Sequence, residues 1–152
     1  MRVRELMSHP VTTIQATESC REAVARMYKS RIRHLPVLNR EGALVGVVTD
    51  RDLRHQLFSP ATFRELGTRS VDALLSAIPV AQIMSTDVVA TEPDADLAEA
   101  ARLMVEEKVG ALPVLERGRV VGILTETDML REVVRADATC EPECAEIIIS
   151  YP

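Results

Sequence analysis

Two stretches of the chain are nearly the same. The sequence GVVTDRD occupies positions 46–52, and GILTETD occupies positions 122–128. The agreement extends well beyond them, because VRELMSHPV corresponds to VAQIMSTDV and HLPVL corresponds to ALPVL. The offset is 77 residues at the start of the unit (3 against 80) and 76 at the repeated stretch (46 against 122). Agreement throughout a whole unit indicates two copies of one supersecondary structure.

Each unit has the same predicted order of elements. A short extended segment, VTTI or VVAT, precedes an amphipathic helix in which apolar residues recur at helical spacing. Ser19 and Asp96 are the expected N-caps of these two helices. Two short strands and a final helix follow, and the second strand (LVGVVT or VVGILT) is apolar at consecutive positions, as in strands buried on both faces. The sequence therefore predicts an α/β (α+β) fold made of two β-α-β-β-α repeats.

The two repeats are expected to form one module. A unit of this size buries too little apolar surface to be stable alone, so we expect the repeats to pack against each other about a pseudo-two-fold axis. The predicted boundaries are residues 1–58 for the first unit, 59–79 for a helical connector, 80–135 for the second unit and 136–152 for a C-terminal tail. The tail carries the apolar run Ile147–Ile149, which we expect to pack on the module.

The repeated Thr-x-x-Asp pair has two interpretations. At a junction between strand and helix it is typical of a capping box, in which the Thr hydroxyl accepts from a backbone N–H and the acidic residue complements the helix dipole. A helix N-terminus also suits phosphate, and a carboxylate beside it can accept from both hydroxyls of a ribose. Recurrence after Gly-apolar-apolar, at matching positions of both repeats, favours the nucleotide interpretation.

Taken together, these motifs resemble those of cystathionine-β-synthase (CBS) domains. They are LM and IM at the starts of the units, RHLPVL and GALPVL in the middle, and GVVTDRD and GILTETD at the end, and the resemblance covers Val3 to Val134. The tandem arrangement is similar to a Bateman module. The resemblance implies a non-catalytic regulatory module with no required cofactor, which binds AMP, ADP, ATP or S-adenosylmethionine in clefts between the repeats. It also implies a disk-shaped homodimer that signals to an effector protein.

The resemblance further implies roles for particular residues. Asp52 and Asp128 match the residue that holds the ribose diol. Thr49 and Thr125 match the hydroxyl that helps to hold phosphate or ribose. The base pocket is implied to include Thr12, Thr13, Val47, Val88, Val89 and Ile123. The cleft is implied to be lined by His34, Leu35, Pro36, Ala111, Leu112 and Pro113.

Basic residues distinguish the two repeats. The first repeat carries Arg33 and Arg51 where the second carries Gly110 and Thr127. Charge-assisted contacts hold phosphate most strongly, so we expect the first repeat's arginines to supply most of the phosphate binding. The alternative is that these arginines form a solvated, charged surface, which is the usual state of arginine.

Composition argues against several other classes of protein. The net charge of −5 argues against nucleic acid as a general partner, because phosphate backbones are bound by clustered Lys and Arg. No apolar run approaches the roughly 20 residues that span a bilayer, and the N-terminus lacks the apolar core of a signal peptide. Three cysteines do not suggest a disulfide framework, so a reducing cytoplasm is the expected location.

No set of catalytic residues or metal ligands is evident in the sequence. The chain has no Gly-x-Ser-x-Gly and no Walker motif, and its three His have no metal-like spacing. We therefore expect neither an enzyme nor a metal site. Two alternatives remain open: a protein-interaction module with vestigial nucleotide clefts, and a small redox enzyme that uses Cys140 and Cys144.

Overall fold

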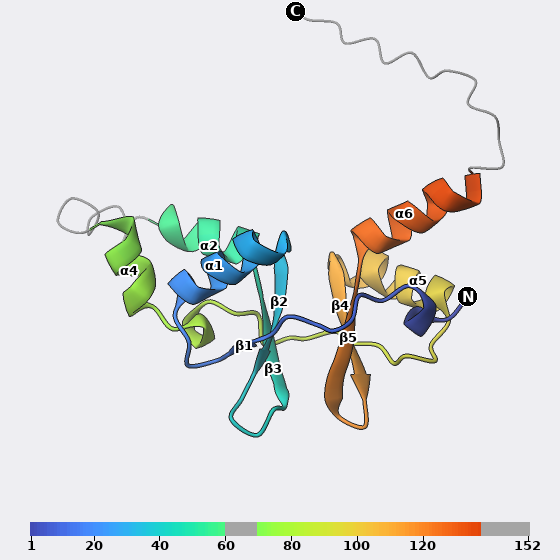
Figure 1. The fold of residues 1–152 in the computed structure, drawn as a ribbon, viewed down its shortest axis with the longest axis horizontal. Helices are drawn as coiled ribbons and strands as arrows, with labels where there is room; N and C mark the ends of the chain where they lie inside the picture. Colours follow the sequence, from blue (N-terminus) through green and yellow to red (C-terminus); the bar gives the residue numbers. More distant parts are fainter. Residues whose placement is uncertain (60–69, 138–152) are drawn as a thin grey trace, which may run out of the picture.

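The two repeats form two halves that lie side by side, each with a small sheet and helices packed on it (Figure 1). This computed structural model describes residues 1–59 and 70–137. The predicted mixed α/β fold is confirmed. In chain order the elements, with η marking 3-10 helices, are η1 (Val3–Glu5), β1 (Ile14–Gln15), α1 (Cys20–Ser30), β2 (His34–Leu38), β3 (Leu44–Thr49), α2 (Asp50–Leu57), α4 (Val71–Ala77), η2 (Val80–Gln82), α5 (Leu97–Glu107), β4 (Ala111–Glu116), β5 (Arg119–Thr125) and α6 (Glu126–Asp137).

Each half is built on an antiparallel hairpin. In the first half β2 pairs with β3, and His34 lies opposite Thr49. In the second half β4 pairs with β5, and Ala111 lies opposite Thr125. Of the predicted opening strand at residues 11–14, only Ile14 lies in a strand, the short β1, which runs parallel to β2. Both Thr-x-x-Asp pairs therefore begin at the end of a strand that pairs with the start of its neighbour.

The opening segment of the second repeat forms less sheet than the sequence predicts. Thr91 makes a single parallel bridge with Val114. In the first repeat the ladder continues, because the N–H of Ala16 donates to the carbonyl of Leu38 over 2.9 Å. The counterpart of Ala16 is Pro93, which has no N–H to donate, so the second ladder stops after one bridge.

The long helices begin where the sequence predicts. Ser19 Oγ accepts from the N–H of Glu22 over 3.3 Å at the start of α1. Asp96 Oδ1 accepts from the N–H of Ala98 over 2.9 Å at the start of α5. Both predicted N-caps are therefore confirmed. The connector also contains a helix, α4, which begins after Ser70.

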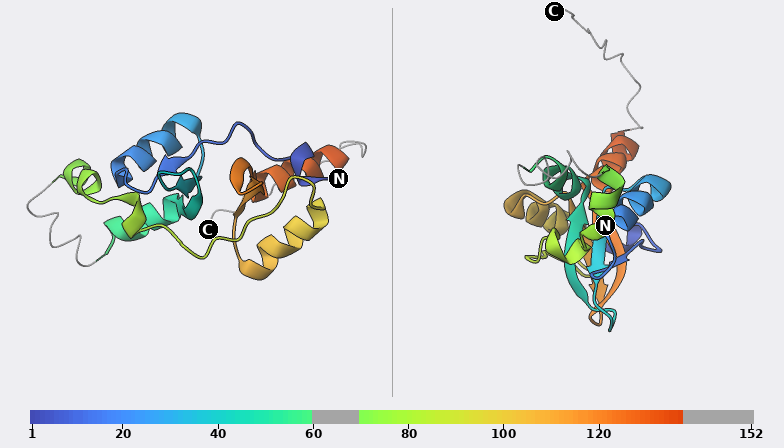
Figure 2. Two further views of the ribbon diagram at one scale, coloured as in Figure 1. Left: turned by 90° about the horizontal axis from the view of Figure 1, so that it is seen from below. Right: turned by 90° about the vertical axis from the view of Figure 1, so that its left-hand side faces the viewer.

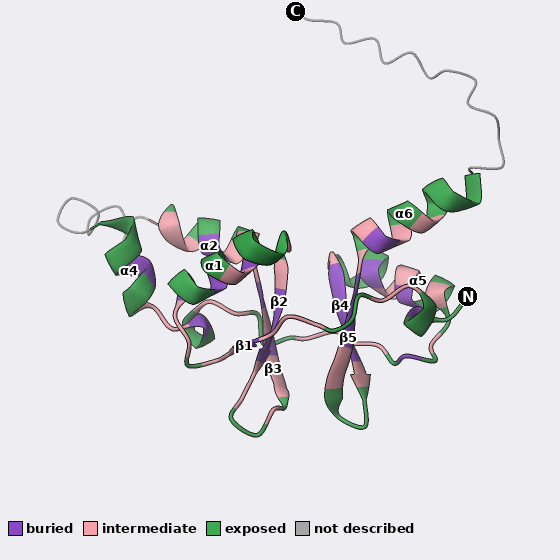
Figure 3. Ribbon diagram, in the orientation of Figure 1, coloured by how far each residue is buried: buried purple, intermediate pink, exposed green. Residues whose placement is uncertain are grey.

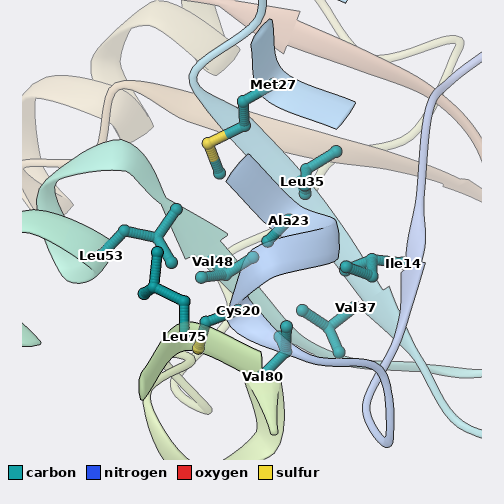
Figure 4. Close-up of a cluster of buried hydrophobic side chains, with 10 residues drawn as sticks. All are labelled: Ile14, Cys20, Ala23, Met27, Leu35, Val37, Val48, Leu53, Leu75 and Val80. Carbon is teal, nitrogen blue, oxygen red and sulfur yellow. The ribbon is translucent and has the colours of Figure 1, made fainter. Parts of the chain in front are cut away.

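The first half has a closed aliphatic core, shown in Figure 4. Apolar side chains of α1 pack on the inner faces of β2 and β3, while Leu53 of α2 and Leu75 of α4 cover the sides. The second half repeats this plan with α5, β4 and β5. Figure 3 shows the buried residues along the strands and on the inner faces of the helices, with exposed residues on the outer helix faces.

Each core is completed by a segment of the other repeat. Val80 in η2 opens the second repeat but belongs to the first core, and Val3 in η1 opens the first repeat but belongs to the second core. Both residues are 0% exposed. Figures 1 and 2 show the two crossing segments, one on each side of the pair of hairpins. This exchange explains physically why one repeat alone would leave a core open.

Backbone hydrogen bonds fix the exchanged segments to the strands. Ser85 and Val47 exchange two hydrogen bonds, of 2.9 and 3.0 Å. Ser8 and Ile123 form the equivalent pair in the other half, with distances of 2.8 and 3.1 Å. The leading segments therefore act as additional sheet edges rather than as linkers.

Two repeated glycines allow this close approach. A Cβ added at Gly46 would lie 2.5 Å from Sδ of Met84 and 2.9 Å from the carbonyl oxygen of Ser85. A Cβ added at Gly122 would lie 2.5 Å from Sδ of Met7. Only a residue without a side chain lets the crossing segment reach the strand at these positions. The repeated Met and Gly residues of the sequence are therefore packing partners across the two halves.

Several sequence predictions fall outside the described residues. Cys140, Cys144 and Ile147–Ile149 lie in the stretch 138–152, for which no structure is described. Helix α6 continues to Asp137, so the predicted start of the tail at residue 136 lies within this helix.

Candidate functional site

Both Thr-x-x-Asp pairs close a hydrogen-bonded ring at the start of a helix. Asp52 Oδ2 accepts from the N–H of Thr49 over 2.8 Å and from its hydroxyl over 2.9 Å, and Thr49 Oγ1 accepts from the N–H of Asp52 over 3.2 Å. Asp128 and Thr125 make the same three contacts, over 2.9, 2.6 and 3.3 Å. The capping interpretation is therefore confirmed at the start of α2.

Capping uses only one oxygen of each carboxylate. In the described part of the chain, Oδ1 of Asp52 accepts no hydrogen bond. Asp128 Oδ1 lies 3.7 Å from Nη1 of Arg131, although the Asp128 residue is only 7% exposed. The ring of hydrogen bonds thus fixes the rotamer of each aspartate and leaves one charged oxygen for another partner. A capping role and a ligand role do not exclude each other here.

The threonine hydroxyls can form fewer hydrogen bonds with a ligand than the sequence implies. Each hydroxyl has one proton, and in both pairs it is donated to the aspartate. Thr49 and Thr125 can still accept a hydrogen bond from a ligand hydroxyl. They cannot donate to a phosphate oxygen without breaking the ring. This geometry favours a sugar beside the pair and places the phosphate elsewhere.

Asp52 opens onto a cavity of about 430 Å³, which we name the Asp52 cleft. Its walls come from both repeats, since Val88 and Val89 reach it from the crossing segment of the second repeat. The volume lies within the range of roughly 300–1,000 Å³ that is typical of small-molecule sites. The residues predicted from the sequence that line this cleft are Arg33, His34, Val47, Thr49, Arg51, Asp52, Val88, Val89 and Ala111.

Asp128 opens onto a second, smaller cavity of about 190 Å³, which we name the Asp128 cleft. Thr12 reaches it from the crossing segment of the first repeat, so the two clefts are related by the pseudo-two-fold axis. The volume lies below the usual range for small-molecule sites. The residues predicted from the sequence that line this cleft are Thr12, Arg33, His34, Ile123, Thr125 and Asp128.

Five of the predicted site residues line neither cleft. Leu35 and Leu112 are 0% exposed and belong to the two cores. The carbonyl oxygen of Thr13 accepts from Nη1 of Arg26 over 2.8 Å. The other two, Pro36 and Pro113, are fully buried. Strand alternation explains Leu35 and Leu112, because a side chain that points into the core cannot also face a cleft on the opposite side of the strand.

Basic side chains reach both clefts across the pseudo-two-fold axis. Arg33, Arg51 and Lys108 line the Asp52 cleft, and Lys108 comes from the second repeat. Arg31, Arg33 and Arg131 line the Asp128 cleft, and Arg31 comes from the first repeat. Arg31 and Lys108 occupy equivalent left-handed C-cap positions, with φ of 53° and 55°. The first repeat's arginines are therefore divided between the two clefts.

The sequence places Arg31 among the first repeat's basic residues without assigning it to a cleft, and it assigns no contact to Lys108. Both residues follow a helix of their own repeat but face the aspartate of the other repeat. The sequence does contain a signal for them. Arg31 and Lys108 are 77 residues apart, the offset between the repeats, so each repeat has a basic residue at the end of its first long helix.

His34 lies between the two clefts and lines both. Its pKa lies below the usual histidine value, mainly because burial disfavours the charged imidazolium, and the nearby Arg33 guanidinium lowers it further. Asp50, Glu126 and Asp52 oppose this shift in the pKa. The imidazole is therefore neutral at pH 7, and it can donate one hydrogen bond and accept another.

Comparison with known proteins decides the family. The family model described as "CBS domain" matches residues 3–59 and 80–135. The chain belongs to the CBS domain family. It is 34% identical over 144 residues to a CBS domain-containing protein of Dictyostelium discoideum. The matched region covers 93% of this chain and 97% of that protein.

Solved CBS pairs share this fold and carry adenine-containing ligands. The CBS domain pair of protein MJ0100, in complex with 5-methylthioadenosine and S-adenosyl-L-methionine, is 26% identical with a TM-score of 0.73, covering 90% of this chain and 98% of that one. CBSX2 in complex with AMP is 25% identical with a TM-score of 0.71, again covering 90% and 98%.

Neither a cluster of metal ligands nor a membrane-spanning helix is present in the described ranges. Across residues 1–59 and 70–137, no three His, Cys, Asp or Glu side chains are grouped as a metal ion would require. No helix in those ranges is both long enough and apolar enough to span a bilayer.

Proposed function

We propose that this CBS pair is a non-catalytic regulatory module that binds an adenine nucleotide or S-adenosylmethionine in the Asp52 cleft. The observation that carries the proposal is the open Oδ1 of Asp52, held in place by its own capping ring at the wall of a cavity of about 430 Å³. The complexes of related CBS pairs with AMP, 5-methylthioadenosine and S-adenosylmethionine support the choice of ligand class.

In the proposed complex the ribose diol donates to Asp52, and the Thr49 hydroxyl accepts from one sugar hydroxyl. The base lies against apolar side chains from both repeats, Val47 and Val88. Arg51 and Lys108 reach the same cavity and can contact the phosphate. Arg54 contributes less, because its guanidinium already pairs with Asp50 over 2.5 Å.

Regulation would follow from the position of the cleft between the repeats. A ligand that touches both repeats stabilises the arrangement in which it fits, by as much as its affinities for the alternative arrangements differ. The signal would pass to an effector protein, through a homodimer or directly. Tyr28 on α1 and Val105 on α5 occupy equivalent positions and are 88% and 76% exposed, so apolar surface for such contacts is present.

That exposed apolar surface also favours a second function, a protein-interaction module whose clefts hold no ligand. The two functions differ in one measurable respect. The interaction module would carry Thr49 and Asp52 only as a helix cap, and its stability would not depend on any nucleotide.

Calorimetric titration with AMP, ADP, ATP and S-adenosylmethionine tests the proposal. We expect a saturable isotherm for at least one of the four, together with a rise in the unfolding temperature in its presence. Uridine monophosphate is the control, because it keeps the ribose and phosphate but lacks the adenine. Four flat titrations and an unchanged unfolding temperature would leave only the interaction module.

A further inference from the structure

The two clefts are separated by a single shared wall. Four residues line both cavities: Arg33, His34, Gly110 and Glu126. The backbone holds the two sides of this wall to the helix starts, since the N–H of Asp50 donates to the carbonyl of Arg33 over 3.1 Å and that of Glu126 donates to the carbonyl of Gly110 over 3.1 Å. A ligand in either cleft therefore meets the same side chains.

The shared wall is not symmetric. Arg33 and His34 of the first repeat correspond to Gly110 and Ala111 of the second, so the first repeat supplies both large side chains. A Cβ added at Gly110 would lie 3.3 Å from Nε2 of His34 and 3.4 Å from Oε2 of Glu126. Glycine at position 110 thus leaves room for His34 and Glu126, two side chains that border both cavities.

Arg33 is the one residue with a fixed positive charge in this wall. It is exposed, and within the described residues its guanidinium forms no ion pair. Three other cations form no ion pair within residues 1–59 and 70–137, and each lines a single cavity: Arg51 and Lys108 the Asp52 cleft, and Arg31 the Asp128 cleft. The wall also holds the carboxylate of Glu126, which adds negative charge beside any phosphate in either cleft.

We infer that Arg33 binds phosphate for both clefts, so that an anionic nucleotide in one cleft weakens the binding of an anionic nucleotide in the other. This inference rests on the proposed function. One guanidinium cannot pair fully with two phosphate groups at once, so the phosphate that binds first leaves the second without its full charge-assisted contact. The coupling is reciprocal, so occupation of the Asp128 cleft must weaken the Asp52 cleft by the same factor.

The coupling should be visible for AMP and absent for adenosine, which has the same base and sugar but no phosphate. The affinity of each cleft alone is measured on the variants Asp128→Asn and Asp52→Asn. In wild type, we expect the second AMP to bind at least about 5-fold more weakly than the dissociation constants of the single-cleft variants predict for independent sites. A factor of about 5 is the lower end of usual coupling factors. Two molecules of adenosine should bind without this deficit.

Arginine variants assign the coupling to one side chain. Arg33→Gln should weaken AMP in both clefts and bring the coupling factor within about 2-fold of unity. Lys108→Gln and Arg31→Gln are matched controls that should each weaken AMP in one cleft only and keep the coupling. Thermal unfolding of each variant confirms that the exposed substitution leaves the fold intact.

Three results would overturn the inference. Independent binding of two AMP molecules to wild type would refute the coupling while leaving the proposed function standing. If AMP gave no binding signal with Asp52→Asn and a one-site isotherm with wild type, the Asp128 cleft would not bind AMP and could not compete for Arg33. Absence of AMP binding to wild type and to both single-cleft variants would remove the proposed function itself, and the inference with it.

Discussion

Substitution of Gly46 by valine is expected to destabilise the CBS pair by about 3–5 kcal/mol, a large part of the stability of a typical domain. The new Cβ would meet Met84 Sδ at 2.5 Å and, more seriously, the carbonyl oxygen of Ser85 at 2.9 Å. A flexible thioether can move, but the backbone of Ser85 is held by its two hydrogen bonds with Val47. The crossing segment must therefore leave the strand, which opens the first core at Val80.

Urea unfolding followed by circular dichroism measures this effect. Ala43→Val is a suitable control, because it places the same side chain at an exposed position just before β3. Gly122→Val should destabilise the protein less than Gly46→Val, since its Cβ would lie 3.3 Å from the carbonyl oxygen of Ser8 rather than 2.9 Å from a backbone atom. An unfolding midpoint of Gly46→Val equal to that of wild type would refute the exchanged packing.

Replacement of Asp52 by asparagine is expected to weaken AMP binding in the Asp52 cleft about 100-fold while changing stability by only about 0.5–1 kcal/mol. The asparagine oxygen can still accept from the N–H and hydroxyl of Thr49, so the capping ring survives. The amide that replaces Oδ1 is a donor, and it cannot accept from the ribose hydroxyls. Two charge-assisted hydrogen bonds are lost, and these account for the fall in affinity.

Asp52→Ala separates the two roles of this residue. It removes the capping ring as well, so we expect a similar loss of AMP affinity together with a further loss of stability of about 1 kcal/mol. Titration calorimetry and urea unfolding of both variants give the comparison. If the Asp52 cleft bound AMP as tightly in Asp52→Asn as in wild type, Asp52 would be a helix cap only and the ribose contact would be excluded.

Local rules predicted much of this protein correctly. The helix caps Ser19 and Asp96 and the ring between Thr49 and Asp52 each depend on a few consecutive residues, and each is formed as the sequence predicts. The mixed α/β fold and the pairing of two CBS repeats also follow from the sequence, because the repeated motifs are specific when they occur twice in order.

Non-local packing could not be predicted in the same way. The repeat boundaries in the sequence give no sign that Val3 and Val80 complete each other's core, since an exchanged segment and an unexchanged one have the same amino-acid pattern. For the same reason Lys108 is found beside Asp52 only when both repeats are seen together. Leu35 was expected to line a cleft but lies in the core, because its position in β2 directs its side chain inward.

The different sizes of the two clefts are a further property of side chains brought together from both repeats. The Asp52 cleft of about 430 Å³ and the Asp128 cleft of about 190 Å³ follow the same backbone plan. The first repeat has Arg33 and His34 at the positions where the second repeat has the smaller Gly110 and Ala111. The repeated motifs identify both clefts as equivalent, whereas the volume of each cleft depends on all the side chains that line it.

The most direct test of this account is a crystal structure of the protein grown with AMP. The account predicts density for AMP in the Asp52 cleft, with the ribose hydroxyls within about 3.2 Å of Oδ1 of Asp52 and the base between Val47 and Val88. The capping contacts of Asp52 Oδ2 with Thr49 should be unchanged. AMP bound elsewhere, or bound in this cleft with its ribose turned away from Asp52, would contradict the central claim that this carboxylate holds the sugar.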